Sequence, residues 1–125
     1  MDFDALLKEA SRYESQLRAH RRALHHIPEL GYEEHETHAY LMEYLRALAP
    51  DDLKTFARTG IRAVFRGDGT GRVIAFRSDI DALPIQEATG RDYASCHSGK
   101  MHACGHDGHM ANLLTFAQWI SEHRE

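Results

Sequence analysis

One stretch, residues 99–110 with the sequence GKMHACGHDGHM, constrains the fold of this chain more than any other. It places one thiol, three imidazoles and one carboxylate within eight consecutive positions, and these are ligand types that proteins use for first-row transition metals. Glycines between them let the backbone turn tightly and bring several side chains to one point. We therefore interpret the stretch as a ligand-bearing loop. Its candidate site residues are His102, Cys104, His106, Asp107 and His109.

Two residues of this stretch are the strongest ligand candidates. A thiolate and an imidazole two positions apart, at Cys104 and His106, match zinc-type ligand chemistry, so we predict that both bind a metal ion. His102, Asp107 and His109 are candidates for direct roles or for supporting these ligands. An isolated histidine is ordinarily a polar surface or structural side chain, and we interpret the outlying histidines in that way. Those are His20, His25, His26, His35, His38 and His123.

A second candidate group stands where an apolar segment ends. Asp79 and Asp81 are two residues apart, a spacing that points both carboxylates to the same side of an extended chain. Carboxylates at the end of a strand are well placed to bind a metal directly or to accept a hydrogen bond from a ligating imidazole. The alternative is that they only cap a turn, as aspartate often does. Next to a Cys/His cluster some twenty residues downstream, we favour a supporting role in the site.

The spacing of apolar residues predicts an α/β fold with two N-terminal helices, a β-hairpin or small mixed sheet, a long loop and a C-terminal helix. Pro28 and Pro50 are expected to end the first two helices. The glycine-rich residues 67–71 are expected to join two strands as a hairpin, with the second strand more deeply buried. The predicted helices are residues 3–26, 33–49 and from Met110 onward, the strands are residues 53–57, 60–66 and 72–78, and the loop is residues 85–100.

Composition limits the functional classes. A chain of 125 residues is the size of one domain, and its net charge of -4 gives no reason to expect nucleic acid or an anionic membrane as a partner. We find no apolar run of membrane-spanning length and no signal peptide, so the cytoplasm is the expected location. In a reducing compartment the two cysteines are expected to stay unlinked, with Cys104 a ligand and Cys96 a free thiol.

Three segments together resemble a known family. Residues 21–37 (RRALHHIPELGYEEHET), 77–87 (RSDIDALPIQE) and 99–111 (GKMHACGHDGHMA) resemble the three N-terminal signatures of the metal-dependent amidohydrolases. That family includes hippurate hydrolase, N-acyl-amino-acid amidohydrolases and indole-acetyl-amino-acid hydrolases, within the wider aminoacylase and carboxypeptidase superfamily. The resemblance implies a two-metal enzyme that cleaves the amide bond of an N-acyl amino acid with metal-activated water.

The resemblance also implies roles for individual residues. Cys104 and His106 match ligands of the metal pair, and Asp81 matches the acidic residue that supports catalysis. Asp79 stands where the wider superfamily has a metal-binding histidine, so its direct ligation stays open. The ligand types suit zinc, manganese, nickel or cobalt, two ions per complete site.

Members of this family are roughly three times longer, as expected of a catalytic domain interrupted by a lid domain. The resemblance therefore implies that residues 1–125 are a single truncated N-terminal part of the catalytic domain, without the lid or dimerisation domain, the general-base glutamate and the later ligands. We expect such a chain to be inactive alone and to self-associate as a homo-oligomer through exposed sheet edges. The alternatives are a non-catalytic metal-binding module and a small structural or interaction domain.

Overall fold

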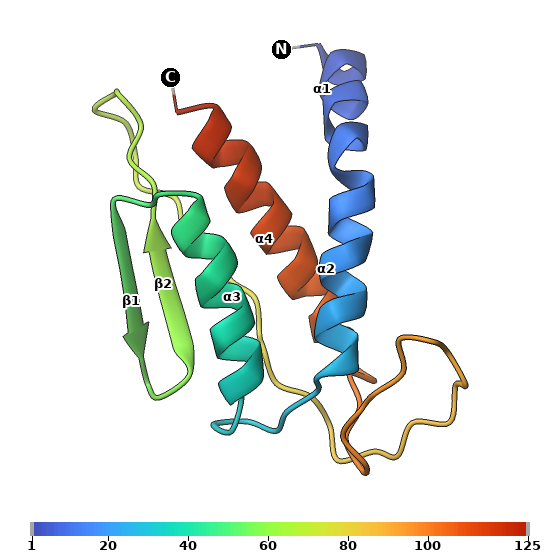
Figure 1. Ribbon diagram of the computed structural model, residues 1–125. Helices are drawn as coiled ribbons and strands as arrows, with labels where there is room; N and C mark the ends of the chain where they lie inside the picture. The colour runs from blue at the N-terminus through green and yellow to red at the C-terminus, as the bar shows by residue number, and fades with distance from the viewer. Residues whose placement is uncertain (1, 125) are drawn as a thin grey trace.

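The computed structural model describes residues 2–124, which form four α-helices, one short 3-10 helix and one two-stranded sheet. The first three helical elements follow one another without an intervening loop and make one long rod (Figure 1). In chain order the elements are α1 (Phe3–Ala10), η1 (Ser11–Tyr13), α2 (Glu14–His26), α3 (His35–Ala47), β1 (Asp52–Phe56), β2 (Gly60–Val64) and α4 (His106–Glu122).

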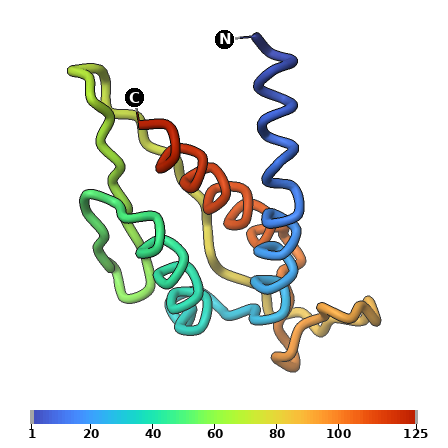
Figure 2. The backbone as a smooth tube through the Cα atoms, turned by 45° about the horizontal axis from the view of Figure 1, so that its top comes forward, coloured from blue at the N-terminus to red at the C-terminus, as the bar shows by residue number. Residues whose placement is uncertain are grey.

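The C-terminal helix α4 occupies the middle of the molecule. It contacts α2 on one side and α3 on the other, and α3 in turn contacts strand β2. Figures 1 and 2 show the resulting order of α2, α4, α3 and hairpin, with the start of α4 next to the end of α2. At the opposite end of α4 the hydroxyl of Tyr13 donates a hydrogen bond to Glu122. The two ends of α4 are therefore both held against the N-terminal rod.

A small apolar core lies where these helices meet. Leu24 of α2, Leu41 of α3, and Met110 and Leu114 of α4 are buried in contact with one another. Burying one such side chain contributes about 1.5–3 kcal/mol, so these contacts hold α4 between its neighbours. Partly buried apolar side chains pack around the cluster, namely Tyr40, Leu45, Ile61 and Ile80.

The helix predictions for residues 3–26 and 33–49 are confirmed with small changes of boundary. The first prediction covers α1, η1 and α2, which end at His26 before Pro28, and the second covers α3. The start of α3 has no hydrogen bond from its own N-cap side chain. Instead the Glu29 carboxylate accepts from the backbone N–H groups of Thr37 at 2.7 Å and Glu36 at 3.0 Å. A buried carboxylate from the preceding turn therefore satisfies donors that the helix itself leaves free.

The predicted hairpin pairs the wrong strands. The sheet joins β1 to β2 in antiparallel register, with Asp52 opposite Val64 and Phe56 opposite Gly60. Residues 72–78 belong to no strand, no backbone–backbone hydrogen bond among the described residues reaches them, and Val73 is 99% exposed. A short continuous run of apolar residues indicates strand character, but a strand also needs a partner for its backbone groups. The part of the chain that the structure describes offers none, so the expected deep burial is wrong as well.

The loop prediction for residues 85–100 is confirmed. Between Leu83 and Met101, which form an isolated antiparallel bridge, the chain contains neither helix nor strand. The loop is nevertheless fixed to the end of α2. The backbone N–H of Cys96 donates to the carbonyl of His26 at 2.8 Å, and Nδ1 of His97 donates to the carbonyl of Pro28 at 2.8 Å.

Among residues 2–124, none of the helices combines the length and apolar character that a membrane crossing requires.

Candidate functional site

The candidate ligand stretch enters its helix earlier than predicted. The apolar pattern places the helix start at Met110, whereas α4 begins at His106, directly after Gly105. Gly105 has φ of 96°, in the left-handed region that favours glycine, and its carbonyl accepts the first amides of the helix, from Gly108 at 3.0 Å and His109 at 3.2 Å. His106, Asp107 and His109 therefore lie in the first turn of a helix and not in a loop. Their positions are fixed by the helix backbone.

The side chain of His106 is oriented by Asp81. Nδ1 of His106 lies 2.9 Å from the backbone carbonyl oxygen of Asp81 and 3.1 Å from its Oδ1. Both neighbours are acceptors, so we assign the ring proton to Nδ1. That tautomer leaves the lone pair of Nε2 free, and Nε2 lies 3.8 Å from Oδ2 of Asp79. The structure thus places both Asp79 and Asp81 beside His106, and the two carboxylates face the same side, as their spacing predicts.

The segment that carries the two aspartates is held by its own backbone. The N–H of Ala82 donates to the carbonyl of Glu29 at 2.7 Å, and Leu83 and Met101 exchange two hydrogen bonds of 3.0 Å. These bonds join the segment that carries Asp81 to Glu29 and to Met101. The Asp81 carboxylate is consequently presented to His106 from a fixed backbone, although its side chain is 41% exposed.

Cys104 and His109 are less constrained. Cys104 is an exposed free thiol, and the ring of the exposed His109 lies 5.9 Å from the ring of His106. Among residues 2–124, three or more His, Cys, Asp or Glu side chains are nowhere arranged to hold a metal ion. The predicted convergence of Cys104 and His106 on one ion therefore stays a prediction. What the structure places together is one imidazole and two carboxylates.

His102 is a buried side chain that lacks the partners such a group ordinarily has. It is 4% exposed, and neither of its ring nitrogens has a hydrogen-bond partner among residues 2–124. Burial lowers the pKa of His102 to about 4, against the smaller raising effect of the nearby Asp107 carboxylate, so the ring is neutral near pH 7. Buried polar atoms are paired in most proteins, and an unpaired imidazole indicates that a further polar group or ion belongs beside it.

Two of the available donor atoms are close enough together to share one divalent metal ion. Metal–nitrogen and metal–oxygen bonds are each about 2.0–2.2 Å, so atoms 3.8 Å apart, as Nε2 of His106 and Oδ2 of Asp79 are, lie within reach of one ion. A ligating histidine characteristically donates its other ring N–H to a carboxylate or a backbone carbonyl, as His106 does to Asp81. Cys104, two residues before His106, adds a thiol of the type that such sites use.

Asp107 does not point toward this group. Its buried carboxylate lies 2.7 Å from Nδ1 of His25 and 3.0 Å from Nε of Arg21, both on α2. The other ring nitrogen of His25 lies 3.0 Å from Oε1 of Glu87. Sequence reasoning assigned His25 an ordinary structural place and did not single out Arg21 or Glu87. Their membership in the segments 21–37 and 77–87 was the available signal.

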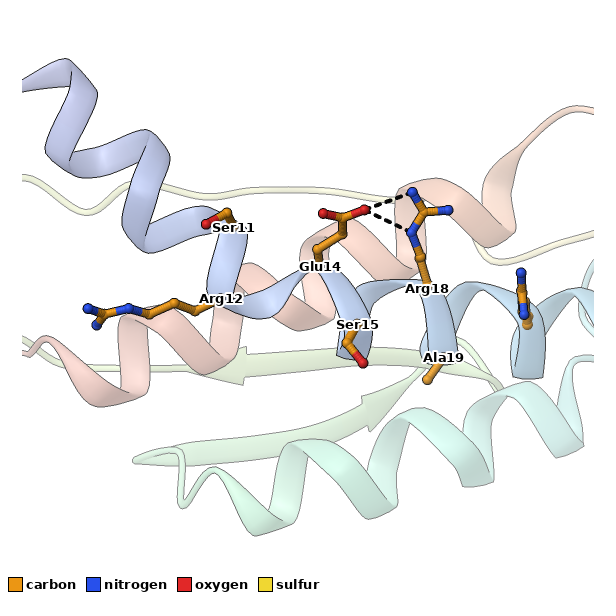
Figure 3. Close-up of a pocket in the computed structure, with 7 residues that line it drawn as sticks. Ser11, Arg12, Glu14, Ser15, Arg18 and Ala19 are labelled. Atoms are coloured by element: carbon orange, nitrogen blue, oxygen red, sulfur yellow. Dashed lines mark hydrogen bonds and ion pairs between the residues drawn. The ribbon is translucent and has the colours of Figure 1, made fainter.

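A surface hollow lies elsewhere. It has a volume of about 550 Å³ and runs along the solvent side of η1 and α2, where Arg18 pairs with Glu14 at 2.7 Å (Figure 3). It shares no residue with the segments 77–87 and 99–111, and we assign it no part in the site. The residues that line it are Ser11, Arg12, Glu14, Ser15, Arg18, Ala19 and Arg22.

Comparison with known proteins identifies relatives of this chain. Residues 75–125 match the model of peptidase family M20/M25/M40. The N-acetyldiaminopimelate deacetylase of Leuconostoc citreum is 51% identical over 112 residues, which are 86% of this chain and 29% of that protein. The chain thus spans less than a third of the length of this curated relative.

Two crystal structures share the fold. The Bacillus subtilis YXEP protein, described as a dinuclear metal binding peptidase from the M20 family, superimposes with a TM-score of 0.85 and 39% identity over 91% of this chain and 32% of that one. A protein from methicillin-resistant Staphylococcus aureus superimposes with a TM-score of 0.89 and 37% identity, over 95% of this chain and 32% of that one.

Proposed function

Because this chain belongs to the M20 peptidase family, we propose that it is the metal-binding N-terminal part of a hydrolase. The proposed reaction is cleavage of the amide bond of an N-acyl amino acid. The observation that carries the proposal is the pair of contacts from Nδ1 of His106 to the carbonyl and the carboxylate of Asp81, from which we assign the ring proton to Nδ1 and a free Nε2 beside Asp79. This is the arrangement of a metal-ligating histidine.

We assign the following roles to the residues of the chain. Cys104 and His106 are the proposed ligands, with Asp79 as a further candidate, and Asp81 orients the imidazole of His106. A divalent ion bound there would polarise the scissile carbonyl and lower the pKa of a bound water. His102 is a proposed neutral hydrogen-bond partner on the buried side. Zinc, manganese, nickel and cobalt all suit this donor set.

The proposed substrate is an N-acetylated amino acid, with N-acetyldiaminopimelate as the first compound to assay. Relatives from several bacteria, among them Leuconostoc citreum, carry the name N-acetyldiaminopimelate deacetylase. Hippurate also contains an N-acyl amino acid amide and is the natural comparison. The proposed location is the cytoplasm, because Cys96 and Cys104 are both exposed free thiols.

We propose that the general base and the remaining ligands come from sequence outside residues 1–125, because the chain spans only 29% of its curated relative. An ion held by two or three ligands without a base within hydrogen-bond reach does not support efficient hydrolysis. The 125-residue chain alone is therefore expected to bind metal weakly and to give no useful turnover.

The direct test joins residues 1–125 to the remaining length of the Leuconostoc citreum deacetylase. The chimera is expected to hydrolyse N-acetyldiaminopimelate in the presence of manganese, zinc, nickel or cobalt. Cys104→Ser is expected to reduce the rate at least 100-fold, because loss of a residue that only hydrogen-bonds to a metal ligand already reduces activity about 10–100-fold. Cys96→Ser is the matched control, because Cys96 is also an exposed thiol but is fixed to His26 through its backbone. A chimera that folds and stays inactive on both N-acetyldiaminopimelate and hippurate, or equal effects of the two serine variants, would contradict the proposal.

A further inference from the structure

A buried group of charged side chains joins the start of α4 to α2 and to the long loop. We call it the Asp107 network, and it consists of Arg21, His25, Glu87 and Asp107. His25 lies between two carboxylates, with Nδ1 2.7 Å from Oδ2 of Asp107 and Nε2 3.0 Å from Oε1 of Glu87. Nε of Arg21 lies 3.0 Å from the same Asp107 oxygen. The side chains of His25, Glu87 and Asp107 are 4%, 3% and 2% exposed.

The network is complete in its hydrogen bonding. Glu87 also accepts from the hydroxyl of Thr89 at 2.5 Å and from the backbone N–H of Ser95 at 2.7 Å. Burial acts to raise the pKa of Glu87, but the hydrogen bonds from Thr89, His25 and Ser95 outweigh it and lower the pKa to about 2. Each ring nitrogen of His25 faces one carboxylate oxygen, so this single side chain bridges Asp107 and Glu87. Buried charges are tolerated when paired in this way.

Two members of the network, Asp107 and Glu87, lie close in the sequence to residues of the candidate site. Asp107 directly follows His106 in the first turn of α4, and Glu87 lies six residues after Asp81 on the same segment. Figure 1 shows the end of α2, the start of α4 and the long loop meeting at one end of the molecule. His25 therefore connects the backbone that carries His106 to the segment that carries Asp81. The network joins the three segments 21–37, 77–87 and 99–111.

We propose that Asp107, His25 and Glu87 are positioning residues, which hold the first turn of α4 against α2 and the long loop so that His106 and Cys104 face Asp79 and Asp81. The inference rests on the proposed function for its consequence in metal binding. The positioning itself is a property of the fold. In this role Asp107 is not a metal ligand, although its place in the sequence beside His106 made it a candidate ligand.

The test compares His25→Gln with a matched control, His38→Gln. Glutamine at position 25 is similar in size to histidine, but its amide oxygen would face a carboxylate, and two acceptors form no hydrogen bond. His38 lies on α3 and is half-buried. Its ring nitrogens lie 2.9 Å from the carbonyl of Thr59 and 3.2 Å from the hydroxyl of Thr55, so both bond outside the network. The purified 125-residue chain is titrated with cobalt(II), and the cobalt–thiolate absorption is recorded. His25→Gln is expected to weaken cobalt binding about 10–100-fold, the effect typical of residues that orient ligands, and His38→Gln is expected to leave it unchanged.

Amide hydrogen exchange gives a readout that does not depend on metal. In His25→Gln the amides of Gly108 and His109 are expected to exchange at least tenfold faster than in the wild-type chain, relative to the amide of Leu114 in the same helix. In His38→Gln this ratio is expected to stay constant. Glu87→Gln, which removes one charge at the edge of the network, serves as a second variant and is expected to change both readouts in the same direction.

The outcomes separate the two proposals. If wild-type cobalt binding does not involve Cys104, the proposed function fails, and the exchange ratio still decides the positioning role. If cobalt binds through Cys104 but His25→Gln and Glu87→Gln match the wild-type chain in affinity and in exchange ratio, the positioning role is overturned and the proposed function stands. Uniformly faster exchange along α4 in both His25→Gln and His38→Gln also overturns it, because that result reports a general loss of stability.

Discussion

The proton on Nδ1 of His106 determines what this side chain can bind. Two oxygens of one residue hold it there, the carbonyl and the carboxylate of Asp81, at 2.9 Å and 3.1 Å. The backbone carbonyl alone preserves the tautomer, so the carboxylate contributes mainly its negative charge, which makes the ring a better donor to a cation. In the proposed site, Asp81 would therefore act on a bound ion through His106 without contacting that ion.

This argument predicts the effect of removing that charge. Asp81→Asn is expected to lower the affinity of the chain for cobalt(II) about tenfold while leaving the fold intact, because the hydrogen bond to the Asp81 carbonyl remains. Isothermal titration measures the change. Asp92→Asn, an exposed carboxylate of the long loop, is the control for a general loss of negative charge. Equal losses in the two variants would mean that Asp81 acts only through net charge.

Single residues also show what the sequence can predict of a site. The two-residue spacing of Asp79 and Asp81 predicts that both carboxylates point to the same side, and in the structure both lie within 4 Å of the ring of His106. The different orientation of Asp107 did not follow from its place in the stretch. Its direction depends on His25 and Arg21, more than eighty residues earlier, and no local pattern encodes that contact.

At the scale of elements, α3 depends on a residue outside it. The Glu29 carboxylate accepts two backbone N–H groups in the first turn of α3, from Thr37 and Glu36. Burial acts to raise the pKa of Glu29, but the hydrogen bonds from Thr37 and Glu36 outweigh it, so the pKa is lowered. A carboxylate whose pKa is lower in the folded state stabilises the fold at a pH above its unfolded value, and this contribution is lost as the pH falls through the folded value.

Glu29→Gln is therefore expected to destabilise the chain by about 1.5–3 kcal/mol at pH 7, the range for hydrogen bonds to a charged acceptor. The difference from the wild-type chain is expected to be constant above about pH 5 and to shrink as the pH falls below the ordinary glutamate pKa of about 4.3. Urea unfolding at pH 7, 5, 4 and 3 measures it. Glu33→Gln, an exposed carboxylate on the same turn, is the control and is expected to have little effect. A pH-independent difference would show that the charge of Glu29 is not what matters.

Elements differ in how far local sequence determines them. The helices α2 and α3 follow from an apolar spacing of 3.6 residues, which is complete within each segment. The start of α4 was predicted too late because its first turn is polar, and the helix begins there on account of Gly105 and the buried contacts of Asp107. The strand predicted at residues 72–78 failed for a non-local reason, since a strand forms only with a partner.

On the scale of the whole molecule, residues 72–78 are the main exposed apolar segment. Val73, Ile74 and Phe76 are 99%, 74% and 56% exposed, and the ring of Phe76 packs against Phe116 of α4, with the ring centroids 4.8 Å apart. The segment is extended, and its backbone groups make no hydrogen bond to another backbone group of the described chain. Such a segment is a template for pairing with a second strand.

We therefore expect the 125-residue chain to form dimers by pairing residues 72–78 with the same segment of a second copy, which covers the apolar side chains and satisfies the backbone at once. Sedimentation equilibrium is expected to give a mass that rises with concentration. Ile74→Lys is expected to shift the chain toward monomer, because lysine on an exposed strand opposes pairing. Leu7→Lys, which replaces a 54% exposed apolar residue on α1, is the control and is expected to leave the association unchanged. A monomer at every concentration, or the same loss of association in both lysine variants, would contradict pairing through this segment.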